Sequence, residues 1–154
     1  GRQSIPTFFP RHRMNSGTFG TMGVGMPFAV GAKVARPDKQ VVLIHGDGSF
    51  GLNCMELDTA ARHKIPMIVV ISLNGGWTAD PKGDKPGRNL GYTRFDLFAQ
   101  SMGCHGEQVD KPEDIRPALE RAKEAIKNGK PALVNVVTDH TARAVTVRFT
   151  KTST

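Results

Sequence analysis

Residues 39–76, KQVVLIHGDGSFGLNCMELDTAARHKIPMIVVISLNGG, contain two apolar runs that each end in a polar residue beside glycine. The first run leads to Gly46, Asp47 and Gly48, and the second leads to Asn74. Continuous apolar runs of this length are typical of strands buried in a parallel sheet. The segment between them, residues 53–64, has apolar residues at helical spacing. The stretch therefore predicts a strand–helix–strand unit.

The rest of the chain continues this alternation of helical patterns and apolar strands. The glycine- and proline-rich residues 75–93 predict a long loop. The alternation predicts an α/β fold, a parallel sheet with helices on both faces. We expect one domain over residues 1–139 and a C-terminal tail over residues 140–154. Further helices are predicted at residues 21–38, 94–103 and 112–129, and a further strand at residues 130–139.

The composition argues against several classes of partner. The chain has 154 residues and a net charge of +7, from 21 basic and 14 acidic residues. The basic residues are scattered, and aromatic residues make up only 6%, so we expect no nucleic-acid partner. No apolar run reaches the roughly 18 residues that a membrane span needs, so we expect no membrane partner.

The N-terminal sequence lacks the apolar core of a secretory signal, which favours a cytoplasmic protein. The chain also begins with Gly1 in place of an initiator Met. We therefore expect it to be the C-terminal piece of a longer protein.

The polar residues at the two strand ends predict a magnesium site. Ligands of parallel sheets bind beyond the carboxyl ends of the strands, so Asp47 and Asn74 meet if their strands are near neighbours. A carboxylate, an amide oxygen and a backbone carbonyl suit Mg²⁺, with phosphate oxygens filling the remaining positions. Gly46 and Gly48 allow close approach of an anion, Ser49 adds a hydroxyl, and the following helix offers free backbone N–H groups.

Either glycine-rich motif alone is more simply explained as a turn. The joint pattern is more specific, because it requires a strand before GDG, a helix, a second strand, and an asparagine at a fixed distance. Here 25 residues separate Gly48 from Asn74.

This pattern resembles the thiamine diphosphate motif of the acetohydroxyacid synthase superfamily. That group includes 2-oxoacid decarboxylases, oxalyl-CoA decarboxylase, benzaldehyde lyase and 2-hydroxyacyl-CoA lyases. The upstream segment GTFGTMGVGMPFAVGAKVARPDKQVVLIHGDGSF also matches, and the resemblance covers residues 17–139. One departure is that the family often has two successive asparagines, where this chain has Leu73 and then Asn74. The second asparagine is the metal ligand, and it is present.

The resemblance implies specific roles for residues of this chain. The side chains of Asp47 and Asn74 and the carbonyl of Gly76 bind Mg²⁺. In the GTMG segment, the Gly20 carbonyl accepts a hydrogen bond from the aminopyrimidine and Met22 forms a wedge under the cofactor. The alternative for Met22 is an ordinary core methionine. The residues implied to bind the cofactor are Gly20, Thr21, Met22, Gly46, Asp47, Gly48, Ser49, Asn74 and Gly76.

The resemblance also implies that the site is shared. In the family, a glutamate that activates the cofactor comes from a separate pyrimidine-binding domain, usually of a partner subunit. Nothing in this chain fits that domain, so we expect a missing domain or subunit and a homodimer or homotetramer. No catalytic residue is assigned within this chain, which is expected to be inactive alone.

The reaction predicted first is that of a 2-hydroxyacyl-CoA lyase, which yields an aldehyde or ketone and formyl-CoA. The Asn-Gly-Gly start followed by Trp77 is more like the acyl-CoA branch than acetolactate synthases. Trp77 is predicted either to border the substrate or to pack on the domain. Arg143 and Arg148 are predicted either to meet the phosphates of a CoA ester, with the tail acting as a lid, or to be solvated surface charges. Arg11 and Arg13 are weaker candidates.

Two other interpretations remain open. The enzyme alternative is a 2-oxoacid decarboxylase or an acetolactate synthase-like carboligase. The non-enzyme alternative is a degenerate cofactor-binding domain with a structural role.

Overall fold

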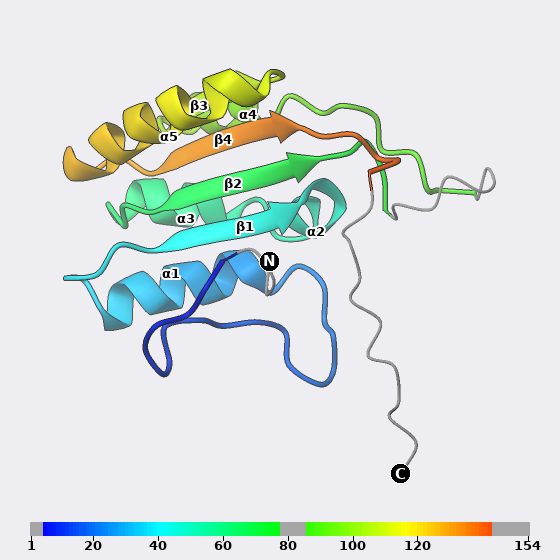
Figure 1. Ribbon diagram of the computed structural model, residues 1–154. Coiled ribbons are helices and arrows are strands. Elements are labelled where there is room, and N and C mark those ends of the chain that lie inside the picture. The colour runs from blue at the N-terminus through cyan, green and yellow to red at the C-terminus, as the bar shows by residue number, and fades with distance from the viewer. Residues whose placement is uncertain (1–4, 78–85, 143–154) are drawn as a thin grey trace, which may run out of the picture.

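A four-stranded parallel sheet forms the centre of the molecule (Figure 1). The computed structural model describes residues 5–77 and 86–142. All three strand pairings are parallel, and the order across the sheet is β1-β2-β4-β3. The predicted α/β fold is confirmed. The strands are β1 (Val42–Gly46), β2 (Ile68–Leu73), β3 (His105–Val109) and β4 (Ala132–Val137).

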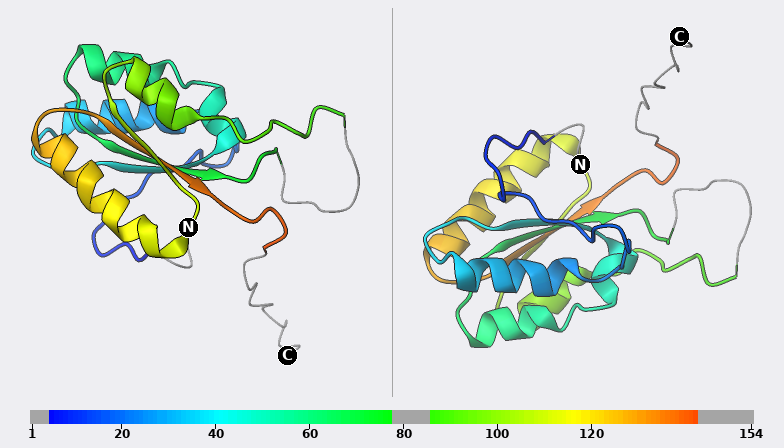
Figure 2. Two further views of the ribbon diagram at one scale, coloured as in Figure 1. Left: turned by 90° about the horizontal axis from the view of Figure 1, so that it is seen from above. Right: turned by 90° about the horizontal axis from the view of Figure 1, so that it is seen from below.

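Helices cover both faces of the sheet (Figure 2). Three lie on one face: α1 (Gly25–Ala35), α3 (Glu56–Arg62) and α4 (Phe95–Ser101). The amphipathic helix α5 (Pro112–Lys127) lies on the other face, against β3 and β4. None of the helices in the described part of the chain is both long enough and apolar enough to cross a membrane.

The core is divided by the sheet into two clusters. The larger cluster lies under α1, α3 and α4 and contains Phe50, Leu57 and Ile71, which are fully buried. The smaller one lies under α5 and contains Ala118, Ala122 and Val134. The central strands β2 and β4 contribute to both clusters, which is why their sequences are continuously apolar.

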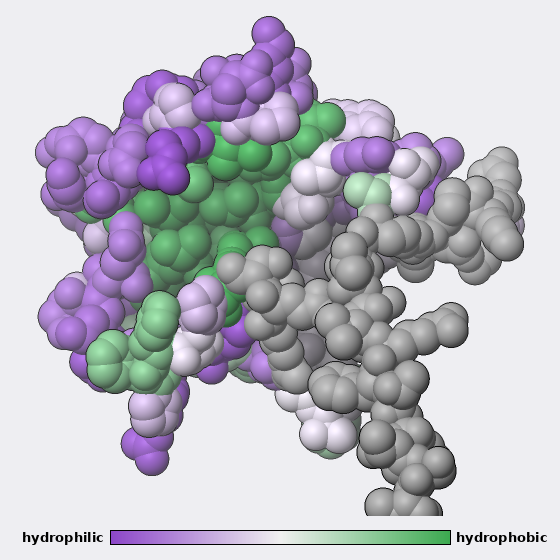
Figure 3. Space-filling model, in the orientation of Figure 1, coloured by the Kyte–Doolittle hydropathy of each residue, from purple (hydrophilic) through white to green (hydrophobic). Residues whose placement is uncertain are grey.

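Helix α5 leaves part of the sheet face on which it packs uncovered. Val42 and Ile44 on β1 point to that face and remain 51% and 52% exposed. Figure 3 shows the resulting hydrophobic area in the middle of this side of the molecule. The sheet is therefore covered on both faces at β4, whereas β1 is covered mainly by α1.

Strand β3 was not predicted from the sequence. Its residues His105–Val109 read HGEQV, which lacks an apolar run, and the strand lies at one edge of the sheet. Arg121 of α5 binds Glu107 of this strand and lowers the pKa of that carboxyl group. Helix α5 also continues through Pro117, which lies one and a half turns from its start.

Candidate functional site

Asp47 joins the ends of the two strands that the sequence pattern singled out. It follows β1 directly, and its side chain is only 4% exposed. Its Oδ1 atom accepts a hydrogen bond of 2.8 Å from the Gly48 N–H, and its Oδ2 atom accepts one of 2.8 Å from the Gly75 N–H. Strands β1 and β2 are direct neighbours, with Gly46 opposite Ser72. The condition on which the predicted meeting of Asp47 and Asn74 depended is therefore met.

Asn74 lies at the end of β2 in a tight turn. Its Oδ1 atom accepts a hydrogen bond of 3.1 Å from the Gly76 N–H. Gly75 between them has a φ of +75°, a left-handed conformation that favours glycine over residues with a Cβ atom. The turn holds the amide oxygen of Asn74 at the same end of the sheet as the carboxylate of Asp47.

A cavity of about 120 Å³ lies at this end of the sheet. It brings together seven of the nine residues predicted to bind the cofactor, and also Trp77. Gly20 and Thr21 are exposed and do not line it. The lining residues are Met22, Gly46, Asp47, Gly48, Ser49, Ser72, Asn74, Gly76 and Trp77.

A hydrogen bond next to Met22 ties its segment to Ser49. The N–H of Gly23 donates a hydrogen bond of 3.0 Å to Ser49 Oγ. This bond joins the segment before α1 to the loop after β1, although 26 residues separate them. Met22 is 48% exposed, so in this chain it is not a core methionine.

Gly48 and Trp77 are in close contact. A Cβ atom at position 48 would lie 2.7 Å from Cε3 of the Trp77 ring. Any side chain there would displace the indole, so glycine is required for this packing. Trp77 therefore packs on the domain and also borders the cavity.

The helix expected after Gly48 differs from the prediction. A single short helix, α2 (Asp47–Gly51), begins at Asp47, and a break follows before α3 begins at Glu56. Turns at Asn53 and Glu56 close this break. A helix therefore does begin at the GDG motif, as predicted, but it has only five residues, so its dipole is small. The groups available to an anion here are side chains and individual backbone N–H groups.

The segment that returns to the sheet after the loop is anchored beside the site. Gly76 pairs with Asn89 in an antiparallel bridge, and the N–H of Leu90 donates to the Gly75 carbonyl at 2.9 Å. The predicted long loop thus has ordered, paired ends. Residues 78–85 lie outside the described part.

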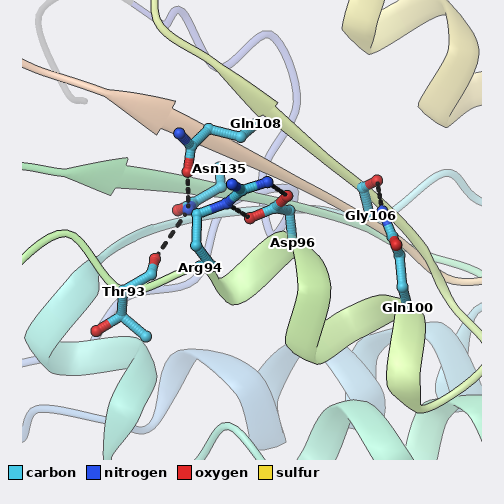
Figure 4. A network of polar contacts seen from close by, with 7 residues as sticks. All are labelled: Thr93, Arg94, Asp96, Gln100, Gly106, Gln108 and Asn135. Atoms are coloured by element: carbon cyan, nitrogen blue, oxygen red, sulfur yellow. Dashed lines mark hydrogen bonds and ion pairs between the residues drawn. The ribbon is translucent and has the colours of Figure 1, made fainter.

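A polar network fixes the next residues of that segment (Figure 4). The fully buried Asn135 of β4 donates to the Thr93 carbonyl at 3.1 Å and to Gln108 at 3.3 Å. Arg94 makes two hydrogen bonds to the buried carboxylate of Asp96, of 2.8 and 2.6 Å. The guanidinium of Arg94 lowers the pKa of Asp96. The network therefore holds the residues before α4 against β4.

Two residues near the site were missed in the sequence. Ser72 lines the cavity, and its Oγ lies 3.3 Å from Thr138 Oγ1. His45 precedes Gly46 on β1, and its Nε2 atom lies 3.3 Å from Ser49 Oγ. Burial lowers the pKa of His45 below its usual value. The position of His45 two residues before Asp47, on the inner side of an apolar strand, was the available signal.

The arrangement fits a magnesium ion with a diphosphate. Asp47 is a buried carboxylate, and within residues 5–77 and 86–142 its partners are two backbone N–H groups and no cation. A buried charge of this kind is costly unless a positive group balances it. The other oxygens at hand, from Asn74 and the backbone, are neutral and hard, as Mg²⁺ prefers. Because most of these oxygens come from amide and backbone groups, the site does not contain a cluster of three or more acidic, histidine or cysteine side chains, and none occurs elsewhere in the described part.

The basic residues proposed for a CoA ester receive no support from the geometry. Arg143 and Arg148, with the lid-forming part of the tail, lie outside the described residues. Arg11 and Arg13 do not line the cavity, and Arg13 donates to the Ile5 carbonyl at 2.8 Å.

A larger hollow, of about 420 Å³, lies at the opposite end of the sheet beside Arg62 and Lys130. Helices α3, α4 and α5 all end there, and helix C-termini disfavour anions. It is therefore a poor site for a diphosphate.

Comparison with known proteins agrees with this geometry. The chain is 43% identical over 145 residues to a probable acetolactate synthase of Mycobacterium bovis, covering 88% of this chain and 25% of the relative. It is 36% identical over 140 residues to 2-hydroxyacyl-CoA lyase 2 of Bos taurus, covering 86% of this chain and 22% of the relative. The chain thus spans about a quarter of the length of these relatives.

A solved structure and a family model also match this chain. The fold is similar to that of the thiamine diphosphate-dependent 4-hydroxybenzoylformate decarboxylase of Rhodococcus jostii RHA1, with a TM-score of 0.71 and 34% identity. That match covers 79% of this chain and 24% of the decarboxylase. The model for the C-terminal TPP binding domain of thiamine pyrophosphate enzymes matches residues 2–136. The chain therefore belongs to the thiamine pyrophosphate enzymes and contains their C-terminal TPP-binding domain.

Proposed function

We propose that this chain binds the diphosphate of thiamine diphosphate, through Mg²⁺, in an enzyme that cleaves or forms a C–C bond beside a carbonyl. One observation carries the proposal: the buried Asp47 carboxylate at the end of β1 is bonded to Gly75 at the end of β2, beside Asn74. The family assignment supports the cofactor, and the chemistry of the oxygen ligands supports the metal.

Each residue has a proposed task in holding the cofactor. Asp47, Asn74 and the Gly76 carbonyl are the metal ligands, and Gly48 and Ser49 contact the diphosphate. Met22 borders the same cavity and would pack under the cofactor as a wedge. When bound, thiamine diphosphate supplies the carbanion that adds to a carbonyl and stabilises the charge left when the neighbouring C–C bond breaks. The protein contributes binding, orientation and exclusion of water.

The remaining catalytic group is proposed to come from elsewhere in the enzyme. The chain spans about a quarter of its relatives, so a further domain or subunit is the expected source of the activating glutamate. We propose a homodimer or homotetramer in which that domain faces this one. The 154-residue chain alone should then bind substrate poorly and show no turnover.

The proposed substrate class is a 2-hydroxyacyl-CoA, cleaved to an aldehyde or ketone and formyl-CoA. The similarity to 2-hydroxyacyl-CoA lyase 2 supports it, as does Trp77 beside the cavity, directly after Asn-Gly-Gly. The higher identity to a probable acetolactate synthase favours a second candidate, a carboligase or decarboxylase that uses a small 2-oxoacid.

A substrate assay on the full-length enzyme, with thiamine diphosphate and Mg²⁺, separates these candidates. Turnover of a 2-hydroxyacyl-CoA, with formyl-CoA as a product, would support the lyase. Rapid turnover of pyruvate without any use of the CoA ester would support the second candidate and reject the first. Binding of the cofactor without turnover of either substrate class would favour a structural role.

A further inference from the structure

His45 is part of a short hydrogen-bond chain that ends at the proposed diphosphate site. Its Nε2 atom lies 3.3 Å from Ser49 Oγ, and the Gly23 N–H donates to that same oxygen at 3.0 Å. Ser49 lines the cavity with Asp47. The imidazole fits under the start of α1 only because residue 25 is glycine, since a Cβ atom there would lie 2.4 Å from Nε2.

The hydrogen positions in this series of hydrogen bonds can be assigned by counting donors and acceptors. The Ser49 hydroxyl has one donor and can accept two hydrogen bonds, of which Gly23 supplies one. A neutral imidazole carries its single N–H on either Nδ1 or Nε2. The Nδ1 atom of His45 is buried and has no hydrogen-bond partner in the described part of the chain.

The unpaired Nδ1 atom decides between the two tautomers. If Nδ1 carried the hydrogen, the protein would bury a donor without a partner, which is rare in native structures. If Nε2 carries it, His45 donates to Ser49 Oγ, and the unpaired Nδ1 is only an acceptor. Ser49 then accepts from both Gly23 and His45, and its own O–H has no acceptor within this chain of bonds.

We propose that His45 is a positioning residue that keeps the Ser49 hydroxyl proton free to donate to a diphosphate oxygen. This inference rests on the proposed function, because it concerns the same cofactor. A hydroxyl whose two acceptor positions are filled by the protein can only donate to a ligand. It is thereby matched to a phosphate oxygen, which is an acceptor. The same bonds fix Ser49 against Gly23, next to Met22.

Calorimetric titration of the full-length enzyme with thiamine diphosphate, at saturating Mg²⁺, tests the proposal through variants of His45. His45→Gln places an amide N–H near the position of Nε2, whereas the shorter His45→Asn reaches only the position of Nδ1. We expect His45→Asn and His45→Leu to raise the Kd about tenfold, as expected for one lost hydrogen bond to a charged group. His45→Gln should stay within about threefold of the wild type. His63→Leu, at an exposed histidine, is the matched control and should have no effect.

Ser49→Ala provides a second arm of the test. If His45 acts through Ser49, then adding His45→Asn to Ser49→Ala should cause no further rise in Kd. Additive effects in the double variant would overturn the proposal, and so would equal Kd values for His45→Asn and His45→Gln. If His45→Leu fails to fold, the Asn and Gln pair still decides. Absence of binding by the wild type would instead reject the proposed function, and this inference with it.

Discussion

Replacing Asp47 with alanine should separate cofactor binding from folding. The substitution removes two hydrogen bonds of 2.8 Å from backbone N–H groups to a charged acceptor. Each such bond is worth about 1.5–3 kcal/mol, but burying an unbalanced carboxylate is itself costly. We therefore expect the free energy of unfolding of the cofactor-free enzyme to fall by only about 1–3 kcal/mol.

Cofactor binding should weaken as well. Asp47 is the only anionic ligand proposed for Mg²⁺, and neutral oxygens alone hold the ion weakly. We expect the Kd for thiamine diphosphate in Asp47→Ala to rise at least about 100-fold, which corresponds to about 2.7 kcal/mol. Asn74→Ala, which removes a neutral ligand, should raise it about tenfold.

Calorimetry of the full-length enzyme, with Mg²⁺ and with a chelator, measures these effects. Asp58→Ala is a suitable control, because Asp58 lies on α3, does not line the cavity and pairs with Arg62 on the same helix. The control should bind the cofactor like the wild type. Unchanged, Mg²⁺-dependent binding by Asp47→Ala would refute the assignment of this residue as the metal ligand.

Three further perturbations test neighbouring parts of the structure. Gly48→Ala should push the Trp77 ring away, because the new Cβ would lie 2.7 Å from it, and should weaken cofactor binding about tenfold by calorimetry. Met22→Ala should slow turnover while leaving the cofactor Kd within about threefold; normal turnover with lower thermal stability would make Met22 purely structural. Arg94 lowers the pKa of Asp96. The pair therefore stabilises the fold at pH values above the unfolded carboxyl pKa of about 4. This contribution is lost as the pH falls through the lower pKa that Asp96 has in the folded protein. Arg94→Ala should lower the midpoint of urea unfolding at pH 7, and this difference should shrink below about pH 4. A difference that is independent of pH would contradict the ion pair's role.

The sequence predicted strands β1, β2 and β4 but not β3. Strands β1, β2 and β4 pack on the hydrophobic clusters, and each therefore contains an apolar run that can be recognised in the sequence. Strand β3 has Glu107 and Gln108 in its short span, and its place depends on pairing with β4 and on Arg121 from α5. Such tertiary partners have no local signal in the sequence.

The site, like the sheet, could be predicted from the sequence only in part. Asp47 and Asn74 could be predicted to meet because parallel strands place their carboxyl ends at the same end of the sheet. The break between α2 and α3 could not be predicted, because residues 53–64 have a helical pattern that extends beyond the observed helix. His45 was also missed, because its role depends on the approach of Gly25 and Ser49 from other segments.

The location of the metal tests the central claim most directly. Crystals of the full-length enzyme with thiamine diphosphate and Mn²⁺ in place of Mg²⁺ would reveal the ion by its anomalous scattering. The structure predicts a peak bonded to Asp47 and Asn74, at about 2.0–2.2 Å from their oxygens, with the diphosphate on its other side. A peak elsewhere, or a diphosphate bound in the larger hollow beside Arg62 and Lys130, would contradict it.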